Sequence, residues 1–409
     1  TALFAELAKL GINYDEDVRP LLGNPIAFGV VGTSNVTGSH LPPFLAAWVT
    51  ESATHLDALI AKLPGLHTTG AFDGAKLYSV GSFAVAITGP TVILAQSAEV
   101  LDQALSRHAH GQGFTAADYA KATTGISSHG AVEMFGDLTG VLSGPSAAAA
   151  RQVPWVAALR GYGASVSASA TGLSMQFHLD TTGRSLQTSE LPMASGSASP
   201  GVAGNLPIQA GLRDPATTID FIVTALKQAD RSAYAKLVRQ EAAFKRRSGV
   251  DVSTLINLLT GNLNIESDTH TTLACVPVSD PAVARALLVK LSAHRSARGG
   301  PGLIGLGGGF FATTSSKSEL TIGVVGGQLL FGRATPAQLR AFAVTHTSTA
   351  SSAGGAVSFR IALPELLGLA LKRAPSPIEQ QALAVIGNLS GSASATTGGV
   401  TGTVTLGLR

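Results

Sequence analysis

The chain has 409 residues, a formal net charge of +3 and only 13% charged residues, whereas globular proteins usually have about 25%. This length allows two or three domains with substantial cores, and so mild a charge argues against a nucleic-acid-binding protein, which needs a clustered basic face. No run of about 18 uninterrupted apolar residues occurs, so no transmembrane helix is predicted. The abundance of small neutral residues favours close packing of surfaces or contact with something apolar.

A stretch near the start of the chain recurs later with fewer acidic residues. Residues 11–24 match residues 249–262, 238 positions further on, with their apolar positions and final Gly-Asn pair in register. Asp15 and Ser253 stand where a helix N-cap is expected, and the acids from Asp15 to Asp17 would lie in the first helical turn. A cation site is the alternative interpretation of these acids, but the second copy lacks them. The stretch therefore predicts a short helix with a structural role.

The following elements recur in the same order. In the first copy the sequence predicts strands at residues 25–32 and 44–49, a helix at 52–63, a hairpin at 83–88 and 91–96, and a helix at 98–107. Counterparts in the second copy are a strand around 273–274, a helix through 286–291, a hairpin at 320–325 and 328–333, and a helix at 336–343. The turns Gly89-Pro90 and Gly326-Gly327 between apolar runs are hairpin signals.

Both copies end in a strand with apolar residues at alternating positions. These residues are Leu173, Met175, Phe177 and Leu179 in the first copy, and Val400, Val404, Leu406 and Leu408 in the second. Each strand follows an identical pentapeptide, SASAT, at residues 167–171 and 392–396. Such alternation is typical of antiparallel sheets that have one packed face and one polar face.

These patterns predict an α+β protein made of two tandem repeats, each an antiparallel sheet with helices packed on one face. The first repeat is expected in residues 1–186, the second in 206–409, and a Ser/Gly/Pro/Ala-rich linker in 187–205. The second copy has a long lead-in before residue 249, and the first has only ten residues before Gly11. We therefore expect a segment of the first repeat, on the order of thirty residues, to precede Thr1.

One segment stands out for its hydrophobicity. Residues 299–311 place five apolar side chains among glycines: Leu303, Ile304, Leu306, Phe310 and Phe311. Two interpretations stay open, a buried core loop or a lid or tip that binds an apolar ligand, a membrane or a partner. These five residues are the candidate ligand-binding residues.

The sequence contains no catalytic signature. The string at residues 300–305 matches G-x-G-x-x-G by letters but has neither the preceding strand nor the following helix that a dinucleotide site needs. Cys275 is the single cysteine and lies in an alternating apolar run, which predicts a buried, inert thiol. His108, His110 and His129 form the only histidine grouping and are expected in surface loops. We expect that the protein is not an enzyme and that it binds neither a cofactor nor a metal ion.

Three features carry a resemblance to a known family. They are the acidic run and Pro-Leu-Leu-Gly within residues 14–23, the apolar strand after them, and the two-part layout across nearly the whole chain. The chain resembles the bacterial family called domain of unknown function thirty-three fifty-two, although Leu22 stands where that family often has an aromatic residue. Members look like exported or envelope proteins with an N-terminal signal or membrane anchor. The resemblance implies an extracytoplasmic location, secreted or anchored in the envelope through a segment upstream of Thr1, and assigns no catalytic residue.

Low charge, the glycine-rich apolar segment and the family resemblance together predict an exported, non-catalytic binding protein of the cell envelope. Its expected ligand is apolar and lipid-like, so the expected partner is a lipid or a membrane surface. The alternative is a structural subunit of an extracellular assembly, such as a surface layer or filament, which would self-assemble. No nucleic-acid partner is expected.

Overall fold

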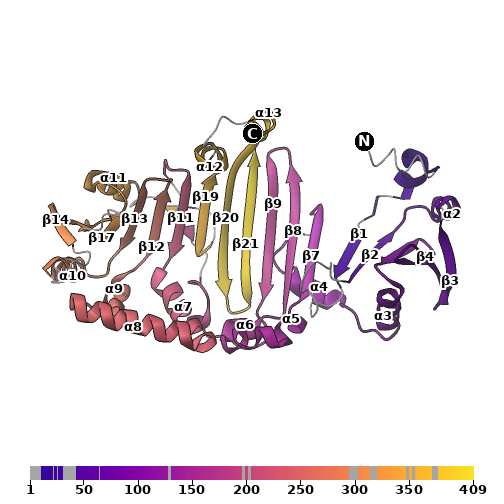
Figure 1. The fold of residues 1–409 in the computed structure, drawn as a ribbon, viewed down its shortest axis with the longest axis horizontal. Helices are drawn as coiled ribbons and strands as arrows, with labels where there is room; N and C mark the ends of the chain where they lie inside the picture. The colour runs from indigo at the N-terminus through magenta and orange to yellow at the C-terminus, as the bar shows by residue number, and fades with distance from the viewer. Residues whose placement is uncertain are drawn as a thin grey trace. The chain divides into compact units, whose positions relative to one another are not determined.

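The computed structural model describes residues 11–21, 23–24, 26–30, 43–63, 65–127, 130–195, 199–200, 204–293, 303–313, 320–346, 350–351, 355–370 and 376–409. In this part of the chain, helices accompany antiparallel sheets of 6, 13 and 2 strands, which confirms the predicted α+β class. The chain forms two compact units, Thr1–Thr115 and Ala116–Arg409 (Figure 1).

The smaller unit is a six-stranded sheet with helices. Its strands are β1 (Ile26–Val30), β2 (Phe44–Val49), β3 (Leu66–Phe72), β4 (Ala75–Val80), β5 (Phe83–Thr88) and β6 (Thr91–Ala95). Its helices are the π-helix η1 (Tyr14–Val18), the 3-10 helix η2 (Arg19–Leu21), α2 (Ala53–Lys62) and α3 (Ala98–Ala109). The strand order is β1-β2-β6-β5-β4-β3, so the predicted hairpin β5–β6 lies at the centre.

Helices cover both faces of this sheet, and the prediction of helices on one face is wrong here. Ala84 and Ala86 of β5 pack with Leu101 of α3, whereas Ile87 packs on the other face with Leu56 of α2. The physical reason is that a central strand with a continuous apolar run needs cover on both sides. Apolar residues at alternating positions indicate only strands that have one solvent-exposed face.

The larger unit contains the remaining elements. Its helices are α4 (Ala116–Ala122), α5 (Thr139–Ser143), η3 (Pro145–Ala147), η4 (Ala150–Gln152), α6 (Pro154–Ala158), η5 (Thr188–Glu190), α7 (Pro215–Ala229), α8 (Arg231–Ser248), α9 (Val252–Leu258), α10 (Pro281–Ala293), α11 (Pro336–His346), α12 (Leu363–Ala370) and α13 (Pro377–Val385). Its early strands are β7 (Val132–Asp137), β8 (Gly161–Ser169), β9 (Gly172–Asp180), β10 (Ser199–Pro200), β11 (Ile208–Arg213), β12 (Asn262–Ser267) and β13 (Thr272–Pro277). Its later strands are β14 (Leu303–Gly307), β15 (Phe310–Thr313), β16 (Thr321–Val325), β17 (Gln328–Gly332), β18 (Ala350–Ser351), β19 (Val357–Ala362), β20 (Ile386–Thr396) and β21 (Gly399–Leu408).

Thirteen of these strands form one sheet. Its order is β14-β15-β16-β17-β13-β12-β11-β19-β20-β21-β9-β8-β7, and β10 pairs with β18 separately. The long strands β20, β21, β9 and β8 lie side by side in the middle of the view (Figure 1). The run β14-β15-β16-β17-β13-β12 has the same arrangement as β3-β4-β5-β6-β2-β1 in the smaller unit. This correspondence is one of topology; the tandem repeat itself stays a prediction.

The boundary between the compact units does not fall in the expected linker. Leu186 and Leu191 are buried with Ala158 of α6 and Ala395 of β20, so the chain around residue 190 belongs to a core of the larger unit. Composition alone could not show this, because two leucines suffice to anchor a stretch otherwise rich in small polar residues.

The caps of the repeated opening helix lie two residues before the predicted positions. The Asn13 side chain accepts a hydrogen bond from the backbone N–H of Asp15 at 3.0 Å, and Asp251 accepts one from that of Ser253 at 3.2 Å. Asn13 and Asp251 are therefore the caps, not Asp15 and Ser253. Both pairs keep the same spacing along the chain, so the two helix starts remain in register.

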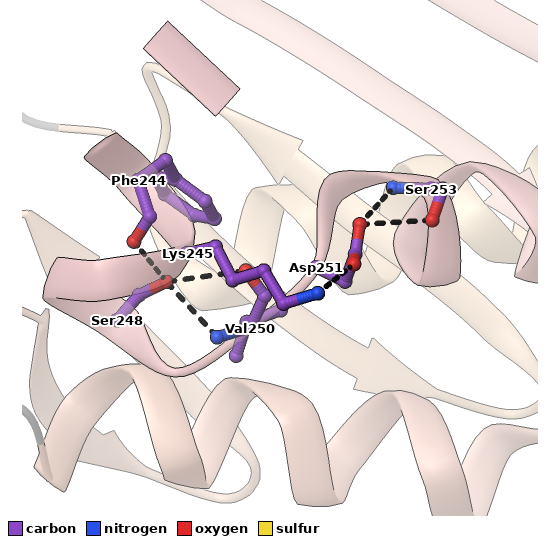
Figure 2. Close-up of polar contacts among 6 residues, drawn as sticks. All are labelled: Phe244, Lys245, Ser248, Val250, Asp251 and Ser253. Atoms are coloured by element: carbon purple, nitrogen blue, oxygen red, sulfur yellow. Dashed lines mark hydrogen bonds and ion pairs between the residues drawn. The ribbon is translucent and has the colours of Figure 1, made fainter. Parts of the chain in front are cut away.

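Figure 2 shows how α8 passes into α9 at the second of these starts. Gly249 ends α8 with a φ of 68°, a left-handed conformation that favours glycine. Ser248 Oγ donates to the Phe244 carbonyl at 2.7 Å and accepts from the Val250 N–H at 3.1 Å. Lys245 Nζ donates to Asp251 Oδ2 at 2.6 Å, so the basic end of α8 is anchored to the cap of the next helix.

Candidate functional site

One face of the 13-stranded sheet is built from apolar residues. Residues directly opposite each other in paired strands share a face, so one row can be followed across every strand. From β7 to β14 this row consists of Val132, Val166, Met175, Val404, Gly391, Phe359, Ala210, Ile265, Ala274, Phe331, Ile322, Phe311 and Gly305. We call this side of the sheet the apolar face.

The opposite side is polar over most of its width. The neighbouring row from β7 to β12 consists of Glu133, Ser165, Gln176, Thr403, Ser392, Ser358, Gly211 and Asn264. We call this side the polar face. Beyond β12 the same row continues as Cys275, Leu330, Gly323 and Phe310. Cys275, Leu330 and Phe310 pack with Leu339 and Phe342 of α11. The sheet therefore separates apolar from polar side chains except where α11 covers it.

Helices cover parts of the apolar face. Leu288 of α10 packs against Val324 at the β14 end of the sheet. Ala158 of α6 and the neighbouring Trp155 pack against Val400 nearer the middle.

On β7, β8 and β9 the cover is incomplete: Ala164 is buried and Phe177 packs against the core that contains Ala158, but other apolar side chains are exposed. Val132 is 52% exposed, Met134 and Leu173 are each 43% exposed, and Tyr162 is 37% exposed. Strand register places all four on the apolar face, and we call them the apolar patch. Val132 and Met134 are neighbours on this face, whereas Tyr162 lies opposite Gly136 and Leu173 lies opposite Ala168, six residues further along β8. Exposed apolar residues without a charged neighbour in their rows are typical of surfaces that contact a partner or a ligand.

Aromatic rings lie over glycines on this face. A Cβ added to Gly402 would lie 2.4 Å from Phe177 Cζ, and one added to Gly391 would lie 2.7 Å from Phe359 Cε1. Each ring is directly opposite its glycine in the neighbouring strand. The absence of a side chain lets each ring lie flat on the backbone, which keeps the face smooth.

The five candidate residues of the glycine-rich segment form a hairpin at the sheet's edge and lie in different environments. Phe311 belongs to the row on the apolar face, and Leu303 is half-buried. Ile304 and Leu306 of β14 are each 48% exposed. Phe310 is 1% exposed and lies on the opposite face from Phe311, because consecutive residues of a strand alternate. The structure therefore does not bring the five side chains together.

Phe310 is part of the core under α11. It packs with Leu330, Leu339 and Phe342, and the Arg340 guanidinium lies 4.8 Å from its ring centre. The same guanidinium donates a hydrogen bond to the Gly308 carbonyl at 3.2 Å. Arg340 thus holds both the ring and the turn of the hairpin.

A buried polar cluster lies where α11 ends on the polar face. His346 Nε2 is 3.4 Å from Glu266 Oε1, and their side chains are 2% and 6% exposed. The backbone N–H groups of Asn205 and Leu206 each donate to Glu266 Oε2 at 3.2 Å. Gln209 lies opposite Glu266 and donates to the Leu206 carbonyl at 3.1 Å. We interpret the cluster as a structural one, whose polar contacts link α11, β11 and β12.

The cysteine, histidine and acidic side chains of the described residues do not form a reactive site. Cys275 is buried, as predicted, and burial raises the pKa of its thiol to about 11, although hydrogen bonds from Asn264 oppose this. The thiol is therefore protonated near neutral pH and is no nucleophile there. The described residues contain no group of three or more His, Cys, Asp or Glu side chains able to hold a metal ion. His108 and His110 are exposed, and His129 lies outside the described residues.

Asp17, the last residue of the acidic run near the start of the chain, links two helices of the smaller unit. Asp17 is buried, and its two carboxylate oxygens accept hydrogen bonds from Lys62 Nζ at 2.7 and 2.9 Å. The backbone N–H of Asn13 also donates to this carboxylate, at 2.9 Å. The Lys62 hydrogen bond is the main cause that lowers the pKa of Asp17. Asp17 thus fixes η1 against α2.

Sequence reasoning missed the apolar patch. The alternation of Leu173 and Met175 was visible, but it predicted a packed face. Exposure depends on which part of the sheet α6 and its core cover, which strand periodicity does not encode. The described helices also include none with the length and apolarity that crossing a membrane requires.

Comparison with known proteins adds little to this picture. No protein-family model matches the chain, and no curated protein matches it. The solved structure titled "Structure of crystal form I of TP0453" is similar over 50% of this chain and 79% of that chain, at 10% sequence identity and a TM-score of 0.29. A TM-score this low supports no conclusion about fold or function. The resemblance to the family of unknown function stays a prediction.

Proposed function

We propose that the protein is an exported, non-catalytic binding protein of the cell envelope that contacts lipid acyl chains through the apolar patch. The exposure of Val132, Met134, Tyr162 and Leu173 on one face of the sheet is the observation that carries this proposal. The extracytoplasmic location is supported only by the family resemblance.

The size of the patch favours reversible contact with a lipid surface over enclosure of a free lipid. Full burial of a large apolar side chain gains about 1.5–3 kcal/mol, so completing the burial of a half-exposed one gains about 1 kcal/mol. Four such residues give roughly 4 kcal/mol, which corresponds to a dissociation constant of about 1 mM before the costs of association. A membrane surface, which presents many acyl chains at once, is therefore the better partner.

Flotation with phosphatidylcholine vesicles tests this proposal. Wild-type protein should float with the vesicles, and the double variant Met134→Gln and Leu173→Gln should partition roughly tenfold less, because two of the four contacts are weakened. Ile304→Gln is the matched control, since Ile304 is as exposed but lies in the edge hairpin. Wild-type protein that stays with the unbound fraction would reject the proposal, and loss of binding only in Ile304→Gln would move the site to the hairpin.

A structural subunit of an extracellular assembly is the second candidate. The sheet has two different ends, β14 with exposed Ile304 and Leu306, and β7 with exposed Val132 and Met134. Pairing of one end with the other end of a second copy would be head-to-tail, the kind of contact that forms a filament when its rotation does not close a ring. Sedimentation velocity over a wide concentration range would exclude this function if only monomer appeared.

A further inference from the structure

Helix α8 has a larger net charge than the whole chain. Its 18 residues contain six basic residues and one acidic residue, which is a net charge of +5. The whole chain has a net charge of +3, so the remainder of the chain is net −2. Figure 1 shows α8 at the lower border of the larger unit, where it packs on α7 and α9. The positive charge of the protein is therefore concentrated in one helix.

The basic side chains lie opposite the packed side of α8. Five buried or half-buried residues recur every three or four positions along one side of the helix: Tyr234, Leu237, Glu241, Phe244 and Ser248. Five basic residues are exposed: Arg231, Lys236, Arg239, Arg246 and Arg247. At 3.6 residues per turn these five side chains fall within about 160° of the circumference, on the side opposite the packed residues. We call them the basic face.

The basic face has no counter-ion within the part of the chain that the structure describes. The printed sequence of α8 contains one acid, Glu241, which lies on the packed side. The ion pair of α8 joins Lys245, outside the basic face, to Asp251 (Figure 2). Arg247 Nε donates a hydrogen bond to the Ala243 carbonyl at 3.2 Å, which leaves its charge uncompensated. The cations of the basic face are therefore available to an anionic partner.

Helix stability does not account for the basic face. Cations suit the last turn of a helix, where they meet the negative end of the macrodipole, and this explains Arg246 and Arg247. Arg231 is the first residue of α8, where the same dipole disfavours a cation. Lys236 and Arg239 are neighbours on the helix surface, and like charges at such spacing repel each other. These positions point to a partner outside the helix.

Apolar side chains along the border of the basic face favour a lipid surface as the anionic partner. Ala235 and Ala242 are exposed, and Val238 is 41% exposed. An anionic bilayer offers phosphates to cations and an apolar region to valine, whereas a nucleic-acid backbone offers only the phosphates. Tyr234 and Phe244, the aromatic residues of α8, lie on its packed side and present no ring for base stacking. A second copy is disfavoured because two basic faces repel each other.

We propose that α8 binds the anionic headgroups of a phospholipid membrane through the basic face. Its cations would contact headgroup phosphates, and Val238 would reach toward the glycerol region beneath them. This contact is electrostatic and lies on a helix. It therefore goes beyond the acyl-chain contact proposed for the apolar patch and does not depend on it.

Flotation of the full chain with phosphatidylglycerol vesicles and with phosphatidylcholine vesicles tests the proposal. Wild type should bind the anionic vesicles more tightly, and added salt should remove this difference because it screens exposed charges. A cation near an anionic surface is worth about fivefold in binding, so the double variant Arg239→Gln and Arg246→Gln should bind phosphatidylglycerol vesicles roughly 30-fold more weakly. Arg107→Gln with Arg333→Gln is the matched control, because it removes two exposed arginines outside α8.

Three outcomes would overturn the proposal. These are equal binding of wild type to the two kinds of vesicle, equal binding by the α8 variant and the control variant, or binding of wild type to a DNA duplex without binding to phosphatidylglycerol vesicles, which would make a nucleic acid the partner. Glutamine favours a helix about as much as arginine does, so circular dichroism should show both double variants folded. If the α8 variant were unfolded, the salt series on wild type decides, since a preference for anionic vesicles that persists in high salt would refute an electrostatic contact.

The same vesicles separate this contact from the apolar patch. Met134→Gln with Leu173→Gln should leave the preference for phosphatidylglycerol over phosphatidylcholine unchanged, because both residues lie outside α8. Wild type that binds only phosphatidylglycerol vesicles would reject the acyl-chain contact and support the basic face. Wild type that binds both kinds equally would do the reverse.

Discussion

Replacing Phe310 by alanine should destabilise the larger unit strongly. The ring is 1% exposed and packs under α11, so its removal leaves a cavity that costs about 3–5 kcal/mol. Loss of the Arg340 guanidinium contact adds roughly 0.5–1 kcal/mol. A total near 4 kcal/mol corresponds to a fall in Tm of roughly 8–16 °C, at about 2–4 °C per kcal/mol for a unit of this size.

Differential scanning calorimetry and urea unfolding measure this effect. Ile304→Ala is the control from the same hairpin, because its side chain is 48% exposed and should change the free energy of unfolding by less than about 0.5 kcal/mol. A cost of less than about 1 kcal/mol for Phe310→Ala, or an equal cost for Ile304→Ala, would contradict the different burial of the two side chains. A small cost of Phe310→Ala would mean that Phe310 is not a core residue, and a role in binding would again be open; a large cost of Ile304→Ala would mean that exposure does not distinguish the two side chains.

Two further predictions concern a glycine on the apolar face and an anchored helix cap. Gly402→Ala should cost about 1–3 kcal/mol, because the new methyl group would meet the Phe177 ring, and Phe177→Leu in the same chain should recover part of that loss. Gly305→Ala, where nothing lies within 4 Å, should be nearly neutral in the same urea titration. The hydrogen bond from Lys245 is the main cause that lowers the pKa of Asp251 from 3.8 to about 2, so this carboxylate stabilises the fold above pH 4 and loses its effect as the pH falls toward 2. Lys245→Met should raise the pKa of Asp251 in an NMR titration and flatten the pH dependence of stability in that window; an unchanged pKa would contradict the assignment.

Much of the local structure could be predicted from the sequence, because local signals fix it. The hairpin of β5 and β6 follows from two apolar runs around Gly89-Pro90, and the strand β9 follows from apolar residues at alternating positions. Burial of Cys275 followed from the apolar strand around it. The predicted N-caps of the repeated opening helix were wrong by two residues, because several polar residues near each helix start could act as the N-cap.

Only the tertiary structure decided which strands meet and which faces are covered. The pairing of β9 with β21 joins residues more than two hundred positions apart, and no local pattern specifies it. Phe310 and Phe311 are neighbours with the same side chain, yet one lies in the core under α11 and the other on the apolar face. The exposure of Leu173 likewise depends on where helices end above the sheet. Strand periodicity determines that a side chain faces one side, and long-range packing determines what lies on that side.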